Sequence, residues 1–316
     1  MDISVVIPAY NEEESLPELH DWIVRVMTAH EFSYEIIFVN DGSTDNTWDE
    51  VEHLHKMNGN VHGLKFMRNY GKAAALNEGF AKAKGDVVIT LDADLQDSPD
   101  EIPELYKMIV EEGFDVVSGW KKKRYDNTFT KNFPSKIYNG TVRLFTGIKL
   151  HDMNSGIKAY KKKVVKSIEV YGEMHRYIPV LAKFAGFTEI GEKVVEHRPR
   201  KYGVTKFGIN RFVNGLLDLM SVLFIGKFSK KPMHFFGTTG IVVFLLGFIS
   251  ALWLGISKLV HLHAGTSAPL VTSSPYFYFA LVCMIIGFQL FLAGYIAELV
   301  SRNSPTRNQY TVDKQV

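Results

Sequence analysis

The sequence predicts an α/β domain with a mostly parallel sheet, followed by two helices that cross a membrane. Short β-branched runs alternate with helical patterns in the N-terminal part of the chain. Such alternation is typical of parallel strands joined by helices that cover both faces of a sheet. Nearer the C-terminal end, two long stretches carry no Asp, Glu, Lys or Arg, which is typical of helices that cross a bilayer.

Five strands are expected in the α/β domain. A helix joins the first two, because Leu16, Leu19, Ile23, Val26 and Met27 recur at helical spacing. Helices between the later strands complete the alternating pattern of a doubly wound sheet. The expected strands are Ile3–Ile7, Glu35–Val39, Val61–Phe66, Asp86–Leu91 and Asp115–Ser118.

Polar residues gather directly after three of these strands. Pro8–Glu12 follows the first, Asn40–Asp45 the second and Asp92–Asp97 the fourth. In open parallel sheets the ligand site lies at the carboxyl ends of the strands, so we expect a site where these runs meet. No G-x-G-x-x-G follows the first strand and no G-x-x-x-x-G-K-[ST] occurs, which disfavours the dinucleotide-binding and P-loop classes.

The run after the fourth strand offers ligands for a divalent cation. Asp92-Ala93-Asp94 places two carboxylates two residues apart, so both project to one side of an extended backbone. Two hard oxygen ligands suit Mg²⁺ or Mn²⁺, with a substrate diphosphate completing the coordination and Gln96 as a further candidate. For an Asp-x-Asp taken alone, the alternative is a solvated loop followed by a helix cap at Ser98–Asp100.

Charge is uneven along a chain whose formal net charge is only +2. Residues 1–118 hold 24 acidic and 8 basic side chains, whereas residues 119–316 hold 10 acidic and 28 basic ones. The basic half predicts a face attracted to anionic lipid, and nucleic-acid binding is disfavoured because no recognition motif accompanies it. The basic residues include Lys121–Arg124, Lys131, Lys136, Arg143, Lys158, Lys161–Lys163 and Lys166. With 46% hydrophobic residues and one cysteine, the chain is neither disordered nor disulfide-stapled.

Phe235–Ser257 and Tyr276–Ala297 are the two expected spans. Each is long enough to cross a hydrocarbon core of about 30 Å at about 1.5 Å per residue, and a buried core helix is the alternative for either. The connecting stretch His261–Ser274 holds no Lys or Arg, so the positive-inside rule places both termini in the cytoplasm. The basic residues outside the spans are Lys227, Lys230 and Lys231 before the first, and Arg302, Arg307 and Lys314 after the second.

Four segments follow from these patterns. Gly208–Gly226 predicts an amphipathic helix, which either lies in the membrane interface or packs on the soluble domain. The N-terminus lacks the basic and apolar regions of a signal peptide, so the first domain is expected in the cytoplasm. The expected segments are 1–207, the cytoplasmic domain; 208–231, the interfacial helix and linker; 232–300, the transmembrane hairpin; and 301–316, a cytoplasmic tail.

Taken together, three motifs resemble the signature of family-2 glycosyltransferases with the GT-A fold. They are Val5–Glu14, Val39–Asp45 and Leu91–Asp97, in this order and spacing. The similarity continues through Arg68–Lys72, Asn154–Gly156 and Arg200–Lys206. With the two spans, about residues 2–305 resemble the polyprenyl-phosphate glycosyltransferases, such as dolichyl-phosphate mannose synthases and the bacterial glucosyl and aminoarabinose transferases. The fold implied is a Rossmann-like GT-A domain.

The resemblance implies roles for the residues at the strand ends. Asp94 is expected at the reaction centre, and Asp41 is expected to hold the base or ribose of the donor. The metal ligands implied are Asp92, Asp94 and Gln96. The residues implied in donor binding are Pro8, Tyr10, Glu12, Val39, Asp41, Asp92 and Ala93.

On the acceptor side the resemblance implies that Arg200 and Lys206 bind phosphate. The family often has Arg where this chain has Lys121, and Arg124 follows one helical turn later. A Lys supplies charge but not a bidentate fork, so either residue can be the one that grips phosphate. The expected acceptor-phosphate residues are therefore Lys121, Arg124, Lys136, Arg200 and Lys206, with Arg124 also counted as catalytic.

The reaction implied is an inverting transfer of a sugar from a nucleotide-sugar, with UDP favoured, to a polyprenyl phosphate, with undecaprenyl phosphate favoured. A divalent metal neutralises the diphosphate leaving group. The acceptor phosphate is largely dianionic at pH 7, so Asp152, the family's usual candidate base, is open to a positioning role instead. The alternatives are a processive polysaccharide synthase, disfavoured because Gln-x-x-Arg-Trp is absent, and a non-catalytic nucleotide-binding membrane adaptor. The resemblance also suggests a homo-oligomer.

Overall fold

The computed structural model describes two compact units of the chain. They are Met1–Leu223 and Phe224–Val316. The residues described are 1–122, 140, 142–143, 146–199, 201, 218–224, 226, 228, 231–267 and 270–303. Each unit is considered by itself.

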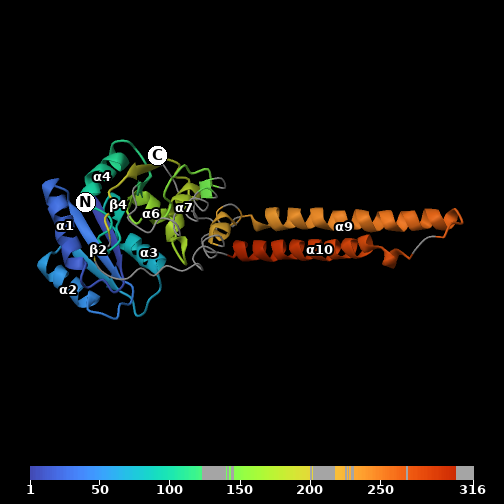
Figure 1. Ribbon diagram of the computed structural model, residues 1–316, viewed down its shortest axis with the longest axis horizontal. Coiled ribbons are helices and arrows are strands. Elements are labelled where there is room, and N and C mark those ends of the chain that lie inside the picture. Colours follow the sequence, from blue (N-terminus) through green and yellow to red (C-terminus); the bar gives the residue numbers. More distant parts are fainter. Residues whose placement is uncertain are drawn as a thin grey trace. The chain divides into compact units, whose positions relative to one another are not determined.

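The described part of the first unit is built on a seven-stranded sheet with the order β3-β2-β1-β4-β6-β5-β7 (Figure 1). β6 runs antiparallel to β4 and β5, and every other neighbouring pair is parallel. The expectation of a mostly parallel sheet is therefore confirmed. The strands are β1 (Ile3–Ala9), β2 (Tyr34–Asn40), β3 (Val61–Lys65), β4 (Val87–Thr90), β5 (Val116–Trp120), β6 (Lys158–Lys161) and β7 (Ile190–Val194).

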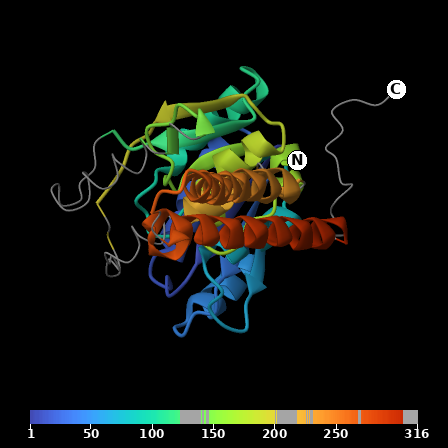
Figure 2. The ribbon, with the colours of Figure 1, turned by 90° about the vertical axis from the view of Figure 1, so that its right-hand side faces the viewer.

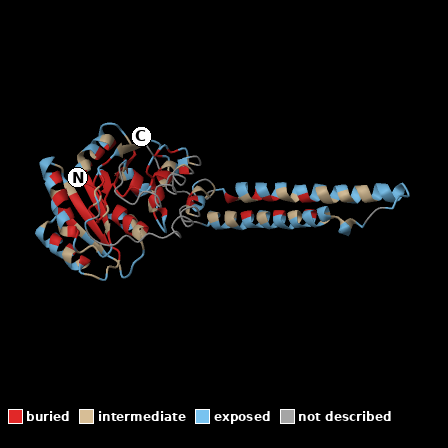
Figure 3. Cartoon of the chain, in the orientation of Figure 1, coloured by how far each residue is buried: buried red, intermediate tan, exposed pale blue. Residues whose placement is uncertain are grey.

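Helices cover both faces of this sheet because side chains alternate along its strands. Ile3, Val5 and Ile7 point into one buried cluster with α1, α2 and α4, while Val6 belongs to a second cluster with α3, α6 and α7. Figure 3 shows the resulting buried sheet between exposed outer helix faces. The helices are α1 (Leu16–Ala29), α2 (Thr47–Met57), α3 (Lys72–Lys82), the 3₁₀ turn η1 (Pro99–Glu101), α4 (Ile102–Val110), α6 (Lys162–Ser167), the 3₁₀ turn η2 (Met174–Tyr177) and α7 (Ile178–Phe184).

All five strands expected from the sequence are present, with bounds shifted by one or two residues. β6 and β7 were not expected. The β6 sequence, Lys-Ala-Tyr-Lys, is typical of a charged surface segment, yet Lys158, Ala159 and Tyr160 are all buried. Of the expected amphipathic helix, residues 208–217 lie outside the described residues, and Leu219 and Val222 are buried in the second cluster.

The second unit contains two long apolar helices, α9 (Pro232–His263) and α10 (Pro275–Arg302), joined by a connection that includes the 3₁₀ turn η3 (Val271–Ser273). Their most apolar windows have mean hydropathies of 2.3 and 2.2, and few residues of either window are buried. Both are long and apolar enough to cross a membrane. The two helices lie side by side in Figures 1 and 2, and the expectation of a two-helix hairpin is confirmed.

Small residues allow the two helices of this hairpin to approach closely. A Cβ added at Gly240 would lie 2.6 Å from the carbonyl oxygen of Gly287, and one added at Gly287 would lie 2.5 Å from the backbone nitrogen of Phe244. Close backbone approach at small residues is a main source of helix association in lipid. Gly255, in contrast, has no heavy atom within 4 Å of an added Cβ.

We predict that Gly287→Ala weakens the hairpin because the new methyl group collides with the backbone of α9. The expected cost is about 1–3 kcal/mol in the free energy of unfolding, as for other overpacked sites. SDS titration of the detergent-solubilised protein measures it. Gly255→Ala is the matched control and should be neutral or slightly stabilising, since Ala has the higher helix propensity. Equal stabilities for the two variants would contradict the close approach.

Candidate active site

Two acidic loops meet at the centre of the sheet in the first unit. The first, residues 92–97, leaves β4, and the second, residues 151–156, leads into β6, the antiparallel neighbour of β4. They touch at Gly156, where an added Cβ would lie 2.4 Å from Oδ2 of Asp92 and 2.7 Å from Oδ2 of Asp97. Only a residue without a side chain fits between these carboxylates. The loops are hereafter called the donor loop (92–97), after the donor-binding role that the resemblance implies for it, and the Asp152 loop (151–156).

Lysines pair with the acids of the donor loop. The ammonium of Lys72, at the start of α3, contacts Oδ1 of Asp92. Lys121, directly after β5, lies 2.6 Å from Oδ1 of Asp97, and both side chains are largely buried. Burial by itself would raise the pKa of Asp92, but Lys72, Lys121 and Lys158 together lower it to about 2. Asp92 is therefore ionised and paired at neutral pH.

The rest of the donor loop is held by a neighbouring segment. Oδ1 of Asp94 accepts a hydrogen bond of 3.2 Å from the backbone nitrogen of Gln96. The Gln96 carbonyl accepts one of 2.9 Å from the backbone of Arg198, and its side-chain amide donates to the Arg198 carbonyl at 3.4 Å. Asp97 and His197 form an isolated antiparallel bridge. The candidate ligands Asp94 and Gln96 thus sit on a loop with fixed backbone geometry.

The loops after β1 and β2 are hydrogen-bonded to one another. The backbone nitrogen of Asn11 donates to Oγ of Ser43 at 2.9 Å, and that of Thr44 donates to Oδ1 of Asn11 at 2.9 Å. Tyr10 is exposed, whereas Val39 is fully buried in the second cluster. Any contact of Val39 with a donor is therefore limited to its backbone. Of the other expected donor residues, Pro8 and Glu12 are half-buried and Ala93 is buried.

Asp41 is buried and fastens a turn. Its carboxylate accepts hydrogen bonds from the backbone nitrogens of Tyr70 (2.7 Å) and Gly71 (3.0 and 3.2 Å). Burial raises the pKa of Asp41, and these two bonds offset part of the rise. The next residue, Gly42, has a φ of +68°, and an added Cβ would lie 2.2 Å from the carbonyl carbon of Arg68. The strand ends of β2 and β3 are packed together at this point.

Asp152 is 2% exposed and lies in a rigidly bonded loop. Its Oδ1 accepts a hydrogen bond of 3.1 Å from the backbone nitrogen of Asn154, and its carbonyl accepts one of 3.1 Å from Oγ of Ser118 in β5. Oγ1 of Thr90 in β4 donates to the carbonyl of Gly156 at 2.8 Å. The structure therefore brings Asp152 to the same end of the sheet as Asp92 and Asp94.

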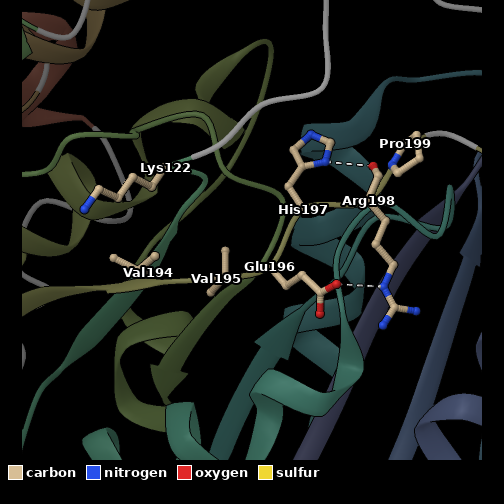
Figure 4. Close-up of a pocket in the computed structure, with 7 residues that line it drawn as sticks. All are labelled: Lys122, Val194, Val195, Glu196, His197, Arg198 and Pro199. Carbon is tan, nitrogen blue, oxygen red and sulfur yellow. Dashed lines mark hydrogen bonds and ion pairs between the residues drawn. The ribbon is translucent and has the colours of Figure 1, made fainter.

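Four expected phosphate-binding residues, Arg124, Lys136, Arg200 and Lys206, lie outside the described residues. The fifth, Lys121, is 12% exposed and engaged with Asp97. A pocket of about 390 Å³ lies beside the points where these segments begin (Figure 4). Its lining consists of Lys122 and the run from Val194 to Pro199, in which Glu196 pairs with Arg198.

Two lysines of this site escaped prediction from the residues themselves. Lys158 was expected on a lipid-facing basic surface, which is wrong, because its side chain is 3% exposed beneath the two acidic loops. Lys72 was noted only as part of the Arg68–Lys72 motif. The carboxylates expected at the strand ends were the available signal. Buried acids require counter-charges, so basic partners could have been expected beside them.

The carboxylates of the donor loop supply some, but not all, of the ligands that a divalent metal ion needs. Among the described residues, no three His, Cys, Asp or Glu side chains are grouped closely enough to hold an ion alone. Asp92 and Asp94 offer hard oxygen ligands of the kind that Mg²⁺ and Mn²⁺ prefer, and diphosphate oxygens can complete the coordination. For Asp92 to serve through Oδ1, that oxygen would have to give up its contact with Lys72, whereas Oδ2 makes no hydrogen bond with Lys72.

Comparison with known proteins identifies the family. The model of glycosyl transferase family 2 matches residues 4–169. The chain belongs to this family. The family-2 chain is 33% identical over 304 residues to the dodecaprenyl-phosphate galacturonate synthase of Rhizobium johnstonii, covering 96% of this chain and 88% of the relative. It is 34% identical over 318 residues to the undecaprenyl-phosphate 4-deoxy-4-formamido-L-arabinose transferase of Proteus mirabilis, covering 99% and 94%.

Solved structures support the fold of this family-2 enzyme. Glucosyl-3-phosphoglycerate synthase of Mycobacterium tuberculosis in complex with UDP superposes with a TM-score of 0.53 at 21% identity, over 71% of this chain and 79% of that one. The same enzyme with Mn²⁺, UDP-glucose and glycerol 3-phosphate gives 0.52 at 20% identity, with the same coverage. At this identity the likeness establishes the fold alone.

We predict that Lys72→Met changes how acid affects stability. The pKa of Asp92 lies below its ordinary value of 3.8, so its ionised form stabilises the folded state above about pH 4 and this stabilisation is lost as the pH falls toward 2. Removing Lys72 raises the pKa of Asp92. The variant should therefore be less stable than the wild type at neutral pH, and its stability should fall by a smaller amount on acidification.

The thermal midpoint between pH 6 and pH 2.5, recorded with a chelator present, measures this effect. Lys107→Met is the matched control and should follow the wild type, because Lys107 is exposed in α4 and its ion-pair partner among the described residues is Glu111. Parallel curves for Lys72→Met and wild type would exclude Lys72 as the counter-charge of Asp92.

Proposed function

We propose that this chain is an inverting glycosyltransferase that moves a sugar from a nucleotide-sugar to a polyprenyl phosphate. The observation that carries the proposal is the similarity, over nearly the whole chain, to transferases named for dodecaprenyl and undecaprenyl phosphate. The acidic loops at the strand ends and the two apolar helices fit the same reaction, because it joins a diphosphate donor to a lipid acceptor.

The donor loop is the proposed binding site for the diphosphate of the donor. Asp92, Asp94 and Gln96 would hold Mg²⁺ or Mn²⁺, which supplies charge neutralisation for the departing nucleoside diphosphate. A UDP donor is favoured because related folds have been solved with UDP and with Mn²⁺ or Mg²⁺. Lys72, once displaced from Asp92, remains close enough to meet a phosphate oxygen as a point charge.

Asp152 is proposed to orient the acceptor. The nucleophile is a phosphate monoester that is already largely ionised at pH 7, so the reaction needs a correctly placed oxygen more than proton removal. The buried, hydrogen-bonded setting of Asp152 suits this positioning role. Asp94 and Arg124 complete the proposed reaction centre.

The acceptor phosphate is proposed to bind Arg124, Lys136, Arg200 and Lys206. Lys121 was expected among them, but its ion pair with Asp97 favours a supporting role under the donor loop. The pocket lined by Lys122 and Val194–Pro199 is the proposed place for part of the acceptor (Figure 4). Its size of about 390 Å³ suits the head of a polyprenyl phosphate.

The catalytic unit is proposed to face the cytoplasm, with both ends of the hairpin on that side. The support is the positive-inside rule applied to the basic residues that flank α9 and α10. Exposed basic residues of the first unit would add attraction to anionic lipid. A homo-oligomer is part of the same proposal.

We predict that Asp94→Ala lowers sugar transfer at least 100-fold, because the diphosphate loses metal-mediated neutralisation. Radiolabelled UDP-sugars are incubated with undecaprenyl phosphate and Mn²⁺, and label is counted in the organic extract. Asp21→Ala is the control, since the Asp21 side chain is exposed and its partner in the described part of the chain is His20 in α1. Wild-type turnover by Asp94→Ala would exclude the proposed metal site, and label in long polymer would instead indicate a polysaccharide synthase.

A further inference from the structure

The Asp152 loop is fastened by one residue from each of four strands. Thr90 in β4 donates to the carbonyl of Gly156, and Ser118 in β5 donates to that of Asp152. The ammonium of Lys158 in β6 donates to the carbonyl of Ser155. Glu192 in β7 accepts from the backbone nitrogen of His151 at 2.7 Å and pairs with its ring. We call Thr90, Ser118, Lys158 and Glu192 the loop clamp.

Sheet register explains how four distant strands reach one short loop. Lys158 is paired with Thr90 on one side and with Ser118 on the other, so these three residues form a row across the sheet. Ser118 is in turn paired with Glu192 in β7. The row therefore runs continuously from β4 to β7 directly below the Asp152 loop.

Lys158 links the Asp152 loop to the donor loop through charge. Burial and the nearby Lys72 lower its pKa to about 8, while Asp152, Asp92 and Asp97 favour the charged form. The ammonium is thus a buried cation that donates to the Asp152 loop, which itself touches the carboxylates of Asp92 and Asp97 at Gly156. Loss of such a cation leaves buried carboxylates without a counter-charge, which is strongly unfavourable.

The space around Lys158 is small, which favours a supporting role over a direct contact with substrate. The cavity beside it leaves only about 10 Å³ open to the centre of a water molecule, which is room for one water and not for a phosphate. Buried polar atoms on its wall, Oγ of Ser155 and the hydroxyl of Tyr160, have no hydrogen-bond partner among the described residues. Lys158 therefore contacts the Asp152 loop from below, at the Ser155 carbonyl, and the space beside it is too small for a phosphate in this structure.

His151 has one contact in addition to the clamp. Its ring, which pairs with the clamp residue Glu192, also stacks on Trp120 at a centroid distance of 4.2 Å and an interplanar angle of 13°. Trp120 ends β5, so the start of the loop is fastened to the same pair of strands that carry Ser118 and Glu192. The carbonyls of Asp152, Ser155 and Gly156 all accept hydrogen bonds, so the loop has little freedom to move.

We propose that the loop clamp positions Asp152 for the transfer reaction, with Lys158 as the residue that couples the Asp152 loop to the donor loop. The inference rests on the proposed function. Its members act through the loop and do not touch substrate, so they are positioning residues. A misplacement of about 1 Å in a reacting group can cost on the order of 10²-fold in rate, which sets the size of the expected effect.

The test compares Lys158→Met with the wild type in two measurements on the full-length protein. We expect kcat for sugar transfer to undecaprenyl phosphate to fall about 10²-fold, with the KM for the nucleotide-sugar changed less than about 3-fold. Hydrogen exchange should rise at the amides of residues 92–97 and 151–156 and stay unchanged in β1 and β2. Lys161→Met is the matched control, because Lys161 lies in the same strand but pairs with Asp115 at 2.9 Å.

Ser118→Ala is the second variant, in case loss of the buried charge prevents folding. It removes one bond to the Asp152 carbonyl without unpairing an acid. We expect a fall in kcat of roughly 3- to 10-fold, equivalent to one lost hydrogen bond, with the same local rise in exchange at residues 151–156. Restoration of kcat by Ser118→Thr, which keeps the hydroxyl, would support a positioning role.

Three outcomes would overturn the inference. The first is a rise in the KM for the nucleotide-sugar that accounts for the whole loss in kcat/KM. The second is hydrogen exchange that increases across the entire sheet. The third is a wild-type kcat in Lys158→Met and Ser118→Ala. A wild-type enzyme that transfers no sugar to any polyprenyl phosphate would refute the proposed function instead. In that event the exchange measurement still decides whether the clamp orders the two loops.

Discussion

Neutralisation of buried carboxylates at the strand ends is the constraint on which the site depends. The donor loop (92–97) and the Asp152 loop (151–156) place several acids against one another in a region with little access to water. Acids buried without partners would be destabilised by several kcal/mol each. Lys72, Lys121 and Lys158 supply the counter-charges, and each comes from a different part of the fold.

The same arrangement prepares the site for a charged substrate. Lys72, Lys121 and Lys158 keep the pKa of Asp92 low, so under the proposed function this carboxylate would be available to a divalent ion that enters with a diphosphate. Lys72 would then lie close to the added negative charge. Preorganised charges of this kind need little rearrangement during reaction, which is the usual basis of electrostatic catalysis.

Much of the fold was predictable from local patterns. The strands β1 to β5 and the helices α9 and α10 can be predicted from the hydrophobic patterns and lengths of their own segments. The candidate acids were also predictable, because they follow strands whose ends must meet at one edge. β6 was not predictable, because its burial depends on insertion between β4 and β5, a long-range pairing that the residues 158–161 do not encode locally.

The sequence alone determined the family, the two apolar spans and the acids Asp92, Asp94 and Asp152, because these depend on motifs and composition within short windows. Only the tertiary structure decided which lysines belong to the site. Lys158 was expected on a basic surface and Lys121 at the acceptor phosphate, yet Lys158 is buried beneath the Asp152 loop and the side chain of Lys121 is largely buried against Asp97. Such pairing arises from sheet order and register, since the folded chain brings together charges that no local spacing relates.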